Sequence, residues 1–277
     1  MKHLKKIFMA VSVVISAQYA GAHYPYVAPL SYQTFNNNTA VLSGFYDNPF
    51  ASEVAIKNFK FHYHTPTGEK IYIDDEQWSK TKTLASYSLE NKLDGTYRIR
   101  GEKEGNTRRY AFDGKHWKDL IQGSPKEGQV NSDKVIYTSQ LDKNAQIKSV
   151  KVLELIETFV SRRMVSNHVI QHIHPGFDVQ FITHPNAIKA NEPIRFKLLD
   201  QMKGIAGVNA EILMQTTDFS RDQKVHQVVK SNAKGELDFK IAEAGQYLLT
   251  VDYQQPFDQS SNELKRYKYT LAFNVIN

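Results

Sequence analysis

The sequence predicts an all-β protein made of two β-sandwich-like domains, the carboxyl-terminal one immunoglobulin- or prealbumin-like. Three observations support this prediction. Short runs of alternating apolar and polar residues dominate the chain, helical periodicity is almost absent, and Gly, Pro, Asn and Asp residues separate the runs. The Pro175-Gly176 pair is a strong breaker, and strand patterning restarts directly after it. We therefore expect one β domain over residues 23–175 and a second over 176–277.

The first 22 residues have the three-part pattern of a secretory signal peptide. Three lysines precede an apolar run at residues 7–17, which is too short to span a bilayer, and Ala20-Gly21-Ala22 supplies the small residues of a cleavage site. The chain contains no cysteine, which suits an exported protein of a bacterial periplasm. We therefore expect a periplasmic protein whose mature chain starts at His23.

Charge and hydropathy exclude two classes of partner. Three of the 35 Lys and Arg residues lie in the predicted signal peptide, so 32 basic side chains would face 29 acidic ones in the mature chain. That balance is too even to indicate nucleic acid or an acidic membrane surface as the partner. No later apolar run is long enough to insert into a membrane, so we expect a soluble protein.

The first half should be built of strands joined by turns. We expect these strands at residues 40–46, 54–64, 70–74, 81–89, 96–100, 109–112, 134–139 and 149–163. The stretch 114–133, which carries Trp117, is rich in Gly, Lys, Ser and Asp and indicates a long loop. A helix around 151–159 is the alternative for the last strand, but the β-branched residues there favour a strand.

The second half carries the pattern of an immunoglobulin-like sandwich. Seven strands are expected at regular spacing, at residues 179–183, 194–199, 209–214, 224–230, 236–241, 246–253 and 267–275. A Gly-x-Tyr turn occurs in both halves, with Tyr97 in the first and Tyr247 in the second. It resembles the tyrosine corner of such sandwiches, whose phenol bonds back to the backbone, so we interpret both tyrosines as structural.

Histidines are the residues that point to chemistry. Cleavage before His23 would combine its α-amine with its imidazole in one chelate ring on a metal ion. His62 and His64 stand at i and i+2 of a predicted strand, and so would share one face. Taken alone, that pair is more typical of a solvated face than of a metal site.

A second group of histidines lies where the two halves join. His172 and His174 form another i, i+2 pair, and His184 precedes a proline that fixes the local chain direction. Singly, each could be a surface or interdomain residue. We predict that His23, His62, His64, His172, His174 and His184 converge on one divalent-metal site, because several imidazoles and an amine suit Ni, Co, Cu or Zn.

No catalytic pattern is present, so we do not expect an enzyme. The chain has no G-x-S-x-G elbow, no phosphate-binding P-loop and no H-E-x-x-H helix. Carboxylate and arginine pairs such as Asp74-Asp75 and Arg162-Arg163 are typical of solvated turns and strand ends.

The order of features along the chain resembles a known family. A signal peptide is followed by His23, YPYVAP, FHYHTPTG, DGTYRI, ITHPNAI and NAKGELDFKIAEAGQYLLTVDY. This order resembles poorly characterised bacterial periplasmic proteins whose better-understood relatives assist nickel or cobalt uptake. The resemblance implies that His23, His62 and His184 belong to a metal site, and that the partner is a membrane transporter.

Three functional classes follow from these observations. The first is a periplasmic accessory protein that binds nickel or cobalt, with copper or zinc as the next choice. The second is an interaction module that binds a protein or glycan by edge strands, with incidental histidines. The third, ranked last, is a copper oxidase whose amino-terminal histidine holds the metal, since no substrate surface can be recognised in the sequence.

Overall fold

The computed structural model describes residues 24–125, 133–216 and 225–277. In these residues regular structure is almost entirely β, and the one α-helix is α1 (His168–Gln171). Two short 3-10 turns, η1 (Asp75–Gln77) and η2 (Thr138–Gln140), complete the helical content of this part. The predicted all-β class is confirmed. The predicted signal peptide and His23 lie outside the described residues.

Two sets of strands follow each other along the chain. The first set is β1 (Tyr24–Pro29), β2 (Gln33–Thr34), β3 (Asn38–Tyr46), β4 (Ser52–Ala55), β5 (Lys60–His64), β6 (Lys70–Ile73), β7 (Ser79–Lys80), β8 (Ala85–Glu90), β9 (Gly95–Phe112), β10 (Trp117–Ile121), β11 (Val135–Tyr137) and β12 (Ile147–Arg162). The second set is β13 (Phe177–Phe181), β14 (Ile188–Lys189), β15 (Ile194–Asp200), β16 (Lys203–Gly204), β17 (Asn209–Met214), β18 (Val225–Lys230), β19 (Glu236–Phe239), β20 (Gly245–Gln254) and β21 (Glu263–Ile276).

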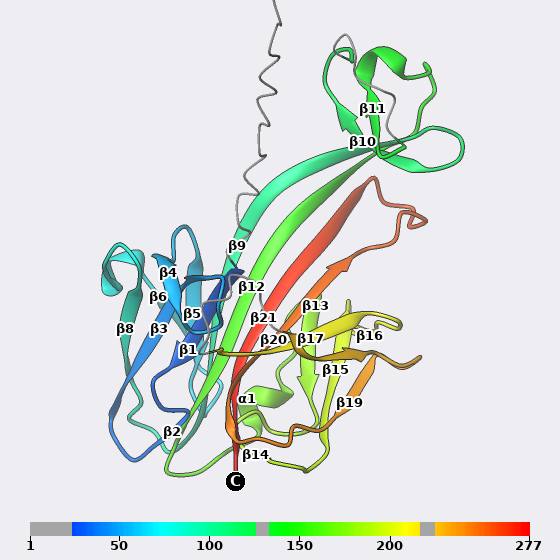
Figure 1. Cartoon of the computed structure of the whole chain (residues 1–277). Coiled ribbons are helices and arrows are strands. Elements are labelled where there is room, and N and C mark those ends of the chain that lie inside the picture. Colours follow the sequence, from blue (N-terminus) through cyan, green and yellow to red (C-terminus); the bar gives the residue numbers. More distant parts are fainter. Residues whose placement is uncertain (1–23, 126–132, 217–224) are drawn as a thin grey trace, which may run out of the picture.

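Three long neighbouring strands, β9, β12 and β21, form the spine of the molecule (Figure 1). β9 pairs antiparallel with β12, and β12 pairs parallel with β21. The sheet continues from β21 through β20 and β17 to β18. The strands of the two halves are therefore hydrogen-bonded in one continuous sheet. The predicted boundary at Pro175-Gly176 falls in the connection between β12 and β13, and a division into two domains there remains a prediction.

Each half closes a sandwich on a different face of this sheet (Figure 1). Side chains alternate along β12, so that Ile156 and Val160 join the core under β3 and β8, whereas Leu155 and Phe159 join the core under β13 and β15. Both cores are built from buried aliphatic and aromatic residues, and burial of that surface is what holds the layers together.

The Gly-x-Tyr turns have the predicted structural role. The Tyr97 hydroxyl accepts a hydrogen bond of 2.8 Å from the Leu93 N–H, and the Tyr247 hydroxyl donates one of 2.9 Å to the Glu243 carbonyl. Each phenol thus bonds to backbone four residues upstream, as a tyrosine corner does.

One strand is longer than predicted. Residues 96–100 and 109–112 belong to the single strand β9, although the charged stretch between them has no apolar alternation. Backbone hydrogen bonds to β12 keep this charged stretch in the strand. A strand whose two faces both meet solvent needs no apolar alternation to pair in this way. Gly101 fits this path closely, since a Cβ there would lie 2.5 Å from the Phe61 ring.

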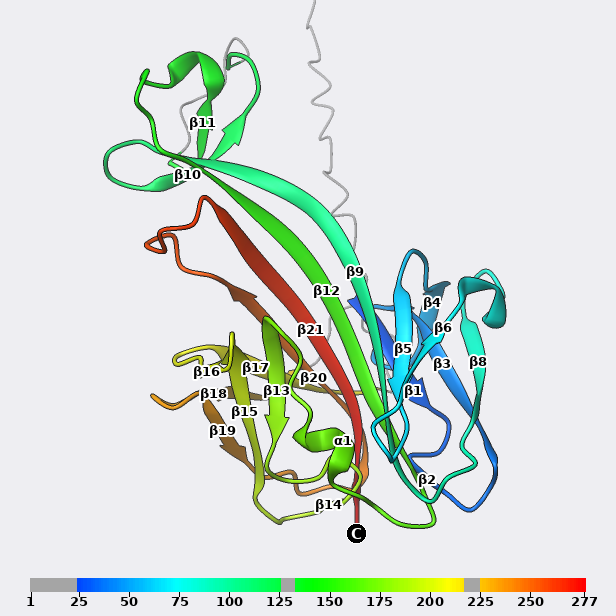
Figure 2. The same cartoon turned by 180° about the vertical axis from the view of Figure 1, so that it is seen from behind.

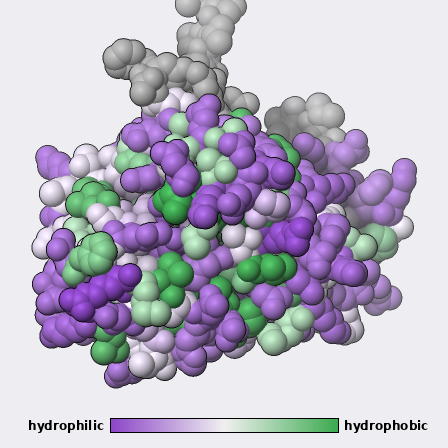
Figure 3. All heavy atoms as spheres, turned by 90° about the horizontal axis from the view of Figure 1, so that it is seen from below, coloured by the Kyte–Doolittle hydropathy of each residue, from purple (hydrophilic) through white to green (hydrophobic). Residues whose placement is uncertain are grey.

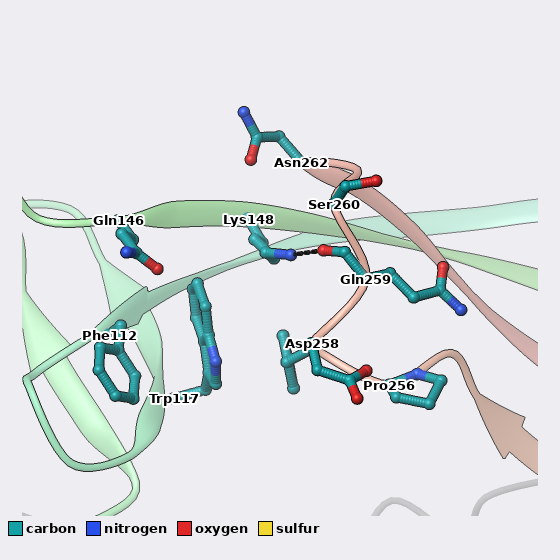
Figure 4. Close-up of a pocket in the computed structure, with 10 residues that line it drawn as sticks. Phe112, Trp117, Gln146, Lys148, Pro256, Asp258, Gln259, Ser260 and Asn262 are labelled. Carbon is teal, nitrogen blue, oxygen red and sulfur yellow. Dashed lines mark hydrogen bonds between the residues drawn. The ribbon is translucent and has the colours of Figure 1, made fainter.

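The predicted loop at 114–133 contains a strand in its described part. β10 pairs antiparallel with β9 and parallel with β11 at the far end of the spine. Trp117 stacks on Phe257 with ring centroids 5.0 Å apart, and Phe112 lies 5.4 Å away on the same aromatic cluster (Figure 4). These aromatic contacts order a segment whose composition indicates a loop. The alternative helix at 151–159 is absent, because those residues lie inside β12.

Candidate metal centre

His62 and His64 project from the same face of β5. In the register with β9, His62 pairs with Arg100 and His64 with Arg98. Both imidazoles are buried, with 4% and 6% of their surface exposed. The solvated-face interpretation of this pair is therefore wrong, and the cause is long-range: another segment of the chain covers this face.

That segment is the connection between β12 and β13. It contains α1, which contacts both β9 and β13 (Figure 2). Arg98 Nη1 donates a hydrogen bond of 2.5 Å to the His172 carbonyl, and the His174 N–H donates one of 2.6 Å to Asp178 Oδ2. These bonds hold the connection across the sheet and bring His172 and His174 to the pair on β5.

The four imidazoles form one cluster. Ring centroids are 5.3 Å apart for His62–His64, 5.6 Å for His64–His174 and 5.8 Å for His62–His174. One ring nitrogen of each of these three lies within 4.8 Å of those of the other two. His172 is exposed and borders the cluster, with its ring 4.9 Å from that of His64 and 4.8 Å from that of His174.

Among the residues that the structure describes, none is a hydrogen-bond partner for one nitrogen of each of the three buried rings. These nitrogens are His62 Nε2, His64 Nδ1 and His174 Nε2. An unpaired buried polar atom costs on the order of 1–3 kcal/mol, and proteins keep few of them. Three in one cluster, all on the side chain that most commonly binds metal, make this cluster the candidate for a metal site.

The other nitrogen of His174 is fixed by a carboxylate. His174 Nδ1 lies 3.0 Å from Asp178 Oδ2, so Nδ1 carries the proton and donates it, which leaves the Nε2 lone pair free. A carboxylate behind a histidine in this way sets the tautomer and ring orientation of a metal ligand.

Asp178 belongs to a buried ion network under the histidines. Asp178 Oδ1 accepts hydrogen bonds of 2.8 Å from Arg98 and 2.9 Å from Arg100, and Glu157 accepts one of 2.6 Å from Arg98 Nε. The Tyr269 hydroxyl adds a 2.7 Å bond to Glu157. These two arginines and two carboxylates are at most 2% exposed, and their formal charges cancel, so the layer under the cluster adds no net charge.

The environment keeps the histidines neutral. Burial lowers the pKa of His62 to about 2 and that of His64 to about 4, and nearby cationic groups such as Lys70 lower both further. Burial also lowers the pKa of His174, against the raising effect of its bond to Asp178. Neutral imidazole is the form that ligates metal.

The carboxylates of the network stay ionised. Burial alone would raise the pKa of Asp178, but Arg98, the His174 hydrogen bond and Arg100 hold it well below its usual range. The two arginines likewise lower the pKa of Glu157, again against the effect of burial.

The structure does not bring His184 into this cluster. His184 Nδ1 accepts a 3.0 Å hydrogen bond from the Asn186 N–H, and Nε2 lies 3.2 Å from the Ser166 carbonyl, to which it donates. Thr96 Oγ1 is also 3.1 Å from Nε2. Both ring nitrogens are thus occupied by protein groups, and His184 holds two loops together. His23 lies outside the described residues, so its predicted chelate is not placed.

Sequence reasoning missed the network under the histidines. Arg98 and Arg100 alternate with Tyr97 and Ile99, which is typical of a strand with one solvated face. Asp178 gave no signal either, because it alternates with Gln180 in β13, a pattern typical of a strand with one solvated face.

Away from the histidine cluster, a pocket of about 690 Å³ lies at the far end of the spine, between Trp117, Lys148 and Asn262 (Figure 4). Its aromatic residues pack on one another, and Lys148 Nζ donates to the Gln259 carbonyl. None of its lining residues has a buried side-chain polar atom that lacks a hydrogen-bond partner among the described residues, in contrast to the three histidines. Within the described residues, no helix is long and apolar enough to cross a membrane.

The chain has remote likenesses to several solved structures. *Escherichia coli* α-2-macroglobulin activated by porcine elastase is 8% identical over 92% of this chain and 20% of its own, with a TM-score of 0.24. A marsupial T cell receptor is 10% identical over 91% of this chain and 72% of its own, with a TM-score of 0.22. A DUF4785 family protein from *Legionella pneumophila* is 9% identical over 89% and 54%, with a TM-score of 0.22. Scores this low carry no argument about function.

The sequence itself is more informative. No curated protein matches it. The domain of unknown function DUF4198 matches residues 20–255, which is most of the chain. This protein therefore belongs to the DUF4198 family.

Proposed function

We propose that this protein binds a divalent transition metal ion through His62, His64 and His174, and that it serves as a periplasmic accessory protein in nickel or cobalt uptake. The observation that carries the metal-binding proposal is the set of three buried, unpaired imidazole nitrogens in one cluster. The periplasmic location and the uptake role rest on the amino-terminal pattern and the family resemblance of the sequence.

The donor set limits the choice of metal. It is made of neutral imidazoles, and the chain has no cysteine that could supply a thiolate. Mg²⁺ and Ca²⁺ prefer oxygen ligands, whereas Ni²⁺, Co²⁺, Cu²⁺ and Zn²⁺ bind imidazole well. Nickel and cobalt come first because of the family resemblance, with copper and zinc next.

The spacing suits one ion after a small adjustment. Metal–nitrogen bonds of about 2.1 Å in tetrahedral geometry would place ligand nitrogens about 3.4 Å apart. The three nitrogens lie within 4.8 Å of one another, so modest ring rotations would close the site. Three protein ligands leave a further coordination position, which is typical of metal sites that exchange a ligand.

An interaction module with incidental histidines is the other functional class. Such a module would need a contiguous exposed apolar or edge surface. Seen from below, apolar side chains stand as separate spots among hydrophilic ones (Figure 3). That face offers no support for the interaction module, and the unpaired imidazoles favour metal binding.

Calorimetry of the mature, exported protein with Ni²⁺, Co²⁺, Cu²⁺ and Zn²⁺ tests the proposal. We expect one ion to bind per chain. His62→Ala or His174→Ala should weaken binding by about 100-fold, because loss of a direct ligand should cost at least as much as the upper end for an outer-shell partner. His116→Ala, which removes an exposed histidine near β10, is the matched control and should bind like the wild type. Equal affinity in all three variants would contradict the proposal.

A further inference from the structure

The four clustered histidines differ in their access to solvent. His62, His64 and His174 are 4%, 6% and 6% exposed, whereas the neighbouring His172 is exposed. A hydrated ion cannot pass directly to three buried nitrogens, because it must first lose water ligands one at a time. A ligand at the mouth of the site would replace those waters stepwise.

His172 is placed for such a role. Its ring lies beside two of the three buried ligands, His64 and His174. Its backbone carbonyl is held by the buried Arg98, and its backbone is extended, with φ −71° and ψ 125° at the end of α1. The main chain is thus anchored while the imidazole lies at the surface, which leaves the ring able to turn between solvent and the cluster.

We propose that His172 is the exchange ligand of the metal centre. It captures the ion at the surface, passes it to His62, His64 and His174, and takes it back when a recipient removes it. This inference rests on the proposed metal-binding function and adds the route by which the ion enters and leaves. The recipient would be a protein that offers imidazole or carboxylate ligands at its surface, because such a group can displace His172 without entering the buried site.

An exchange ligand has a kinetic signature that distinguishes it from an ordinary fourth ligand. An exchange ligand lowers the kinetic barrier to metal binding and to metal release alike. Its removal therefore slows both steps and leaves the dissociation constant nearly unchanged. Loss of an ordinary ligand weakens the bound state, so that release becomes faster and affinity falls.

Stopped-flow measurements with Co²⁺, and with a chelator for release, provide the test. For His172→Ala we expect association and release to slow by about tenfold, the lower end of what loss of an outer-shell partner costs in activity, with an almost unchanged dissociation constant. Added free imidazole should restore both rates. The matched control is His168→Ala, an exposed histidine on the same connection whose ring lies against Gly68.

The outcomes are separable. Unchanged rates in His172→Ala, or faster release with about tenfold weaker binding, would overturn the exchange role while leaving the metal site in place. Co²⁺ binding that is unaffected by His62→Ala and His174→Ala would overturn the proposed function itself. Slowed rates in His168→Ala equal to those in His172→Ala would show that any change in this connection has the same effect, and would also overturn the exchange role.

Discussion

Two regions of this protein bury histidine, and they do so in opposite ways. His184 makes a hydrogen bond at each ring nitrogen, and these bonds tie residues 166 and 186 together. The cluster of His62, His64 and His174 is equally buried but leaves one nitrogen of each ring unpaired. Burial of a histidine therefore does not by itself make it a candidate ligand, and the proposed metal site rests on burial without a hydrogen-bond partner. Four changes test this difference.

The largest effect should come from the network that supports the cluster. Asp178→Ala would leave Arg98 and Arg100 with only Glu157 as a shared carboxylate, and removing one partner of a buried ion pair costs about 3–5 kcal/mol. Urea unfolding measures the loss. The control is Asp252→Ala, which breaks a partly exposed pair with Arg266 and should cost less than about 1 kcal/mol. Equal losses would contradict the special role of the network.

Metal should stabilise the protein through the cluster alone. At a nickel concentration about 1,000 times the dissociation constant, binding to the folded state adds about 4 kcal/mol to the free energy of unfolding. His62→Ala should abolish this gain, and His184→Ala should keep it even though its own metal-free stability is lower. Thermal unfolding with and without nickel reports both. A gain lost in His184→Ala would place that residue in the site after all.

Apolar replacement should change stability with opposite signs in the two regions. In the metal-free protein, His62→Leu removes a buried unpaired nitrogen and should raise the free energy of unfolding by about 1 kcal/mol. His184→Leu leaves the Asn186 N–H and the Ser166 carbonyl without their partner and should lower the free energy of unfolding by about 1–3 kcal/mol. Destabilisation by both changes would mean that the His62 nitrogen is satisfied in solution.

The last comparison is the effect of pH on the stability of the metal-free protein, which is spread over several pH units. Because burial holds the pKa of His62 at about 2 and of His64 at about 4, the unfolded chain, with a pKa near 6.5, binds more protons in acid. Stability is therefore full above about pH 7 and falls as the pH drops below about 6.5, with each histidine adding a slope of about 1.4 kcal/mol per pH unit. The free energy of unfolding, measured at several pH values between 7 and 4, gives the slope. A His62→Leu, His64→Leu double variant should flatten it, and an unchanged slope would contradict this account.

Much of the fold could be predicted from the sequence, because its signals are local. Alternation predicted strands such as β3, β12 and β17 but not β1 or β10, and the Gly-x-Tyr turns predicted the backbone bonds of Tyr97 and Tyr247. The continuity of β9 could not be predicted, because backbone pairing rather than side-chain pattern carries it through its charged middle.

The site was predictable only in part. The i, i+2 spacing put His62 and His64 on one face and His172 near His174, but spacing cannot say which other segment covers that face. For the same reason, Arg98 and Arg100 could not be distinguished from solvated residues. The grouping of His184 with the site failed because its partners, Thr96 and Ser166, come from other elements.

The pairing of β12 with β21 has a consequence for the order in which the chain can fold. Thr158 Oγ1 bonds to the Ala272 carbonyl across 114 residues of sequence, and the ladder from Ser149 to Thr158 is completed by 263–272. A chain that emerges amino-terminus first exposes one edge of β12 until its last strand arrives. Folds dominated by such distant pairings are slow to form, and an unpaired edge of this length can capture other strands. A chaperone that shields β12 would be most needed in that interval, before β21 is available.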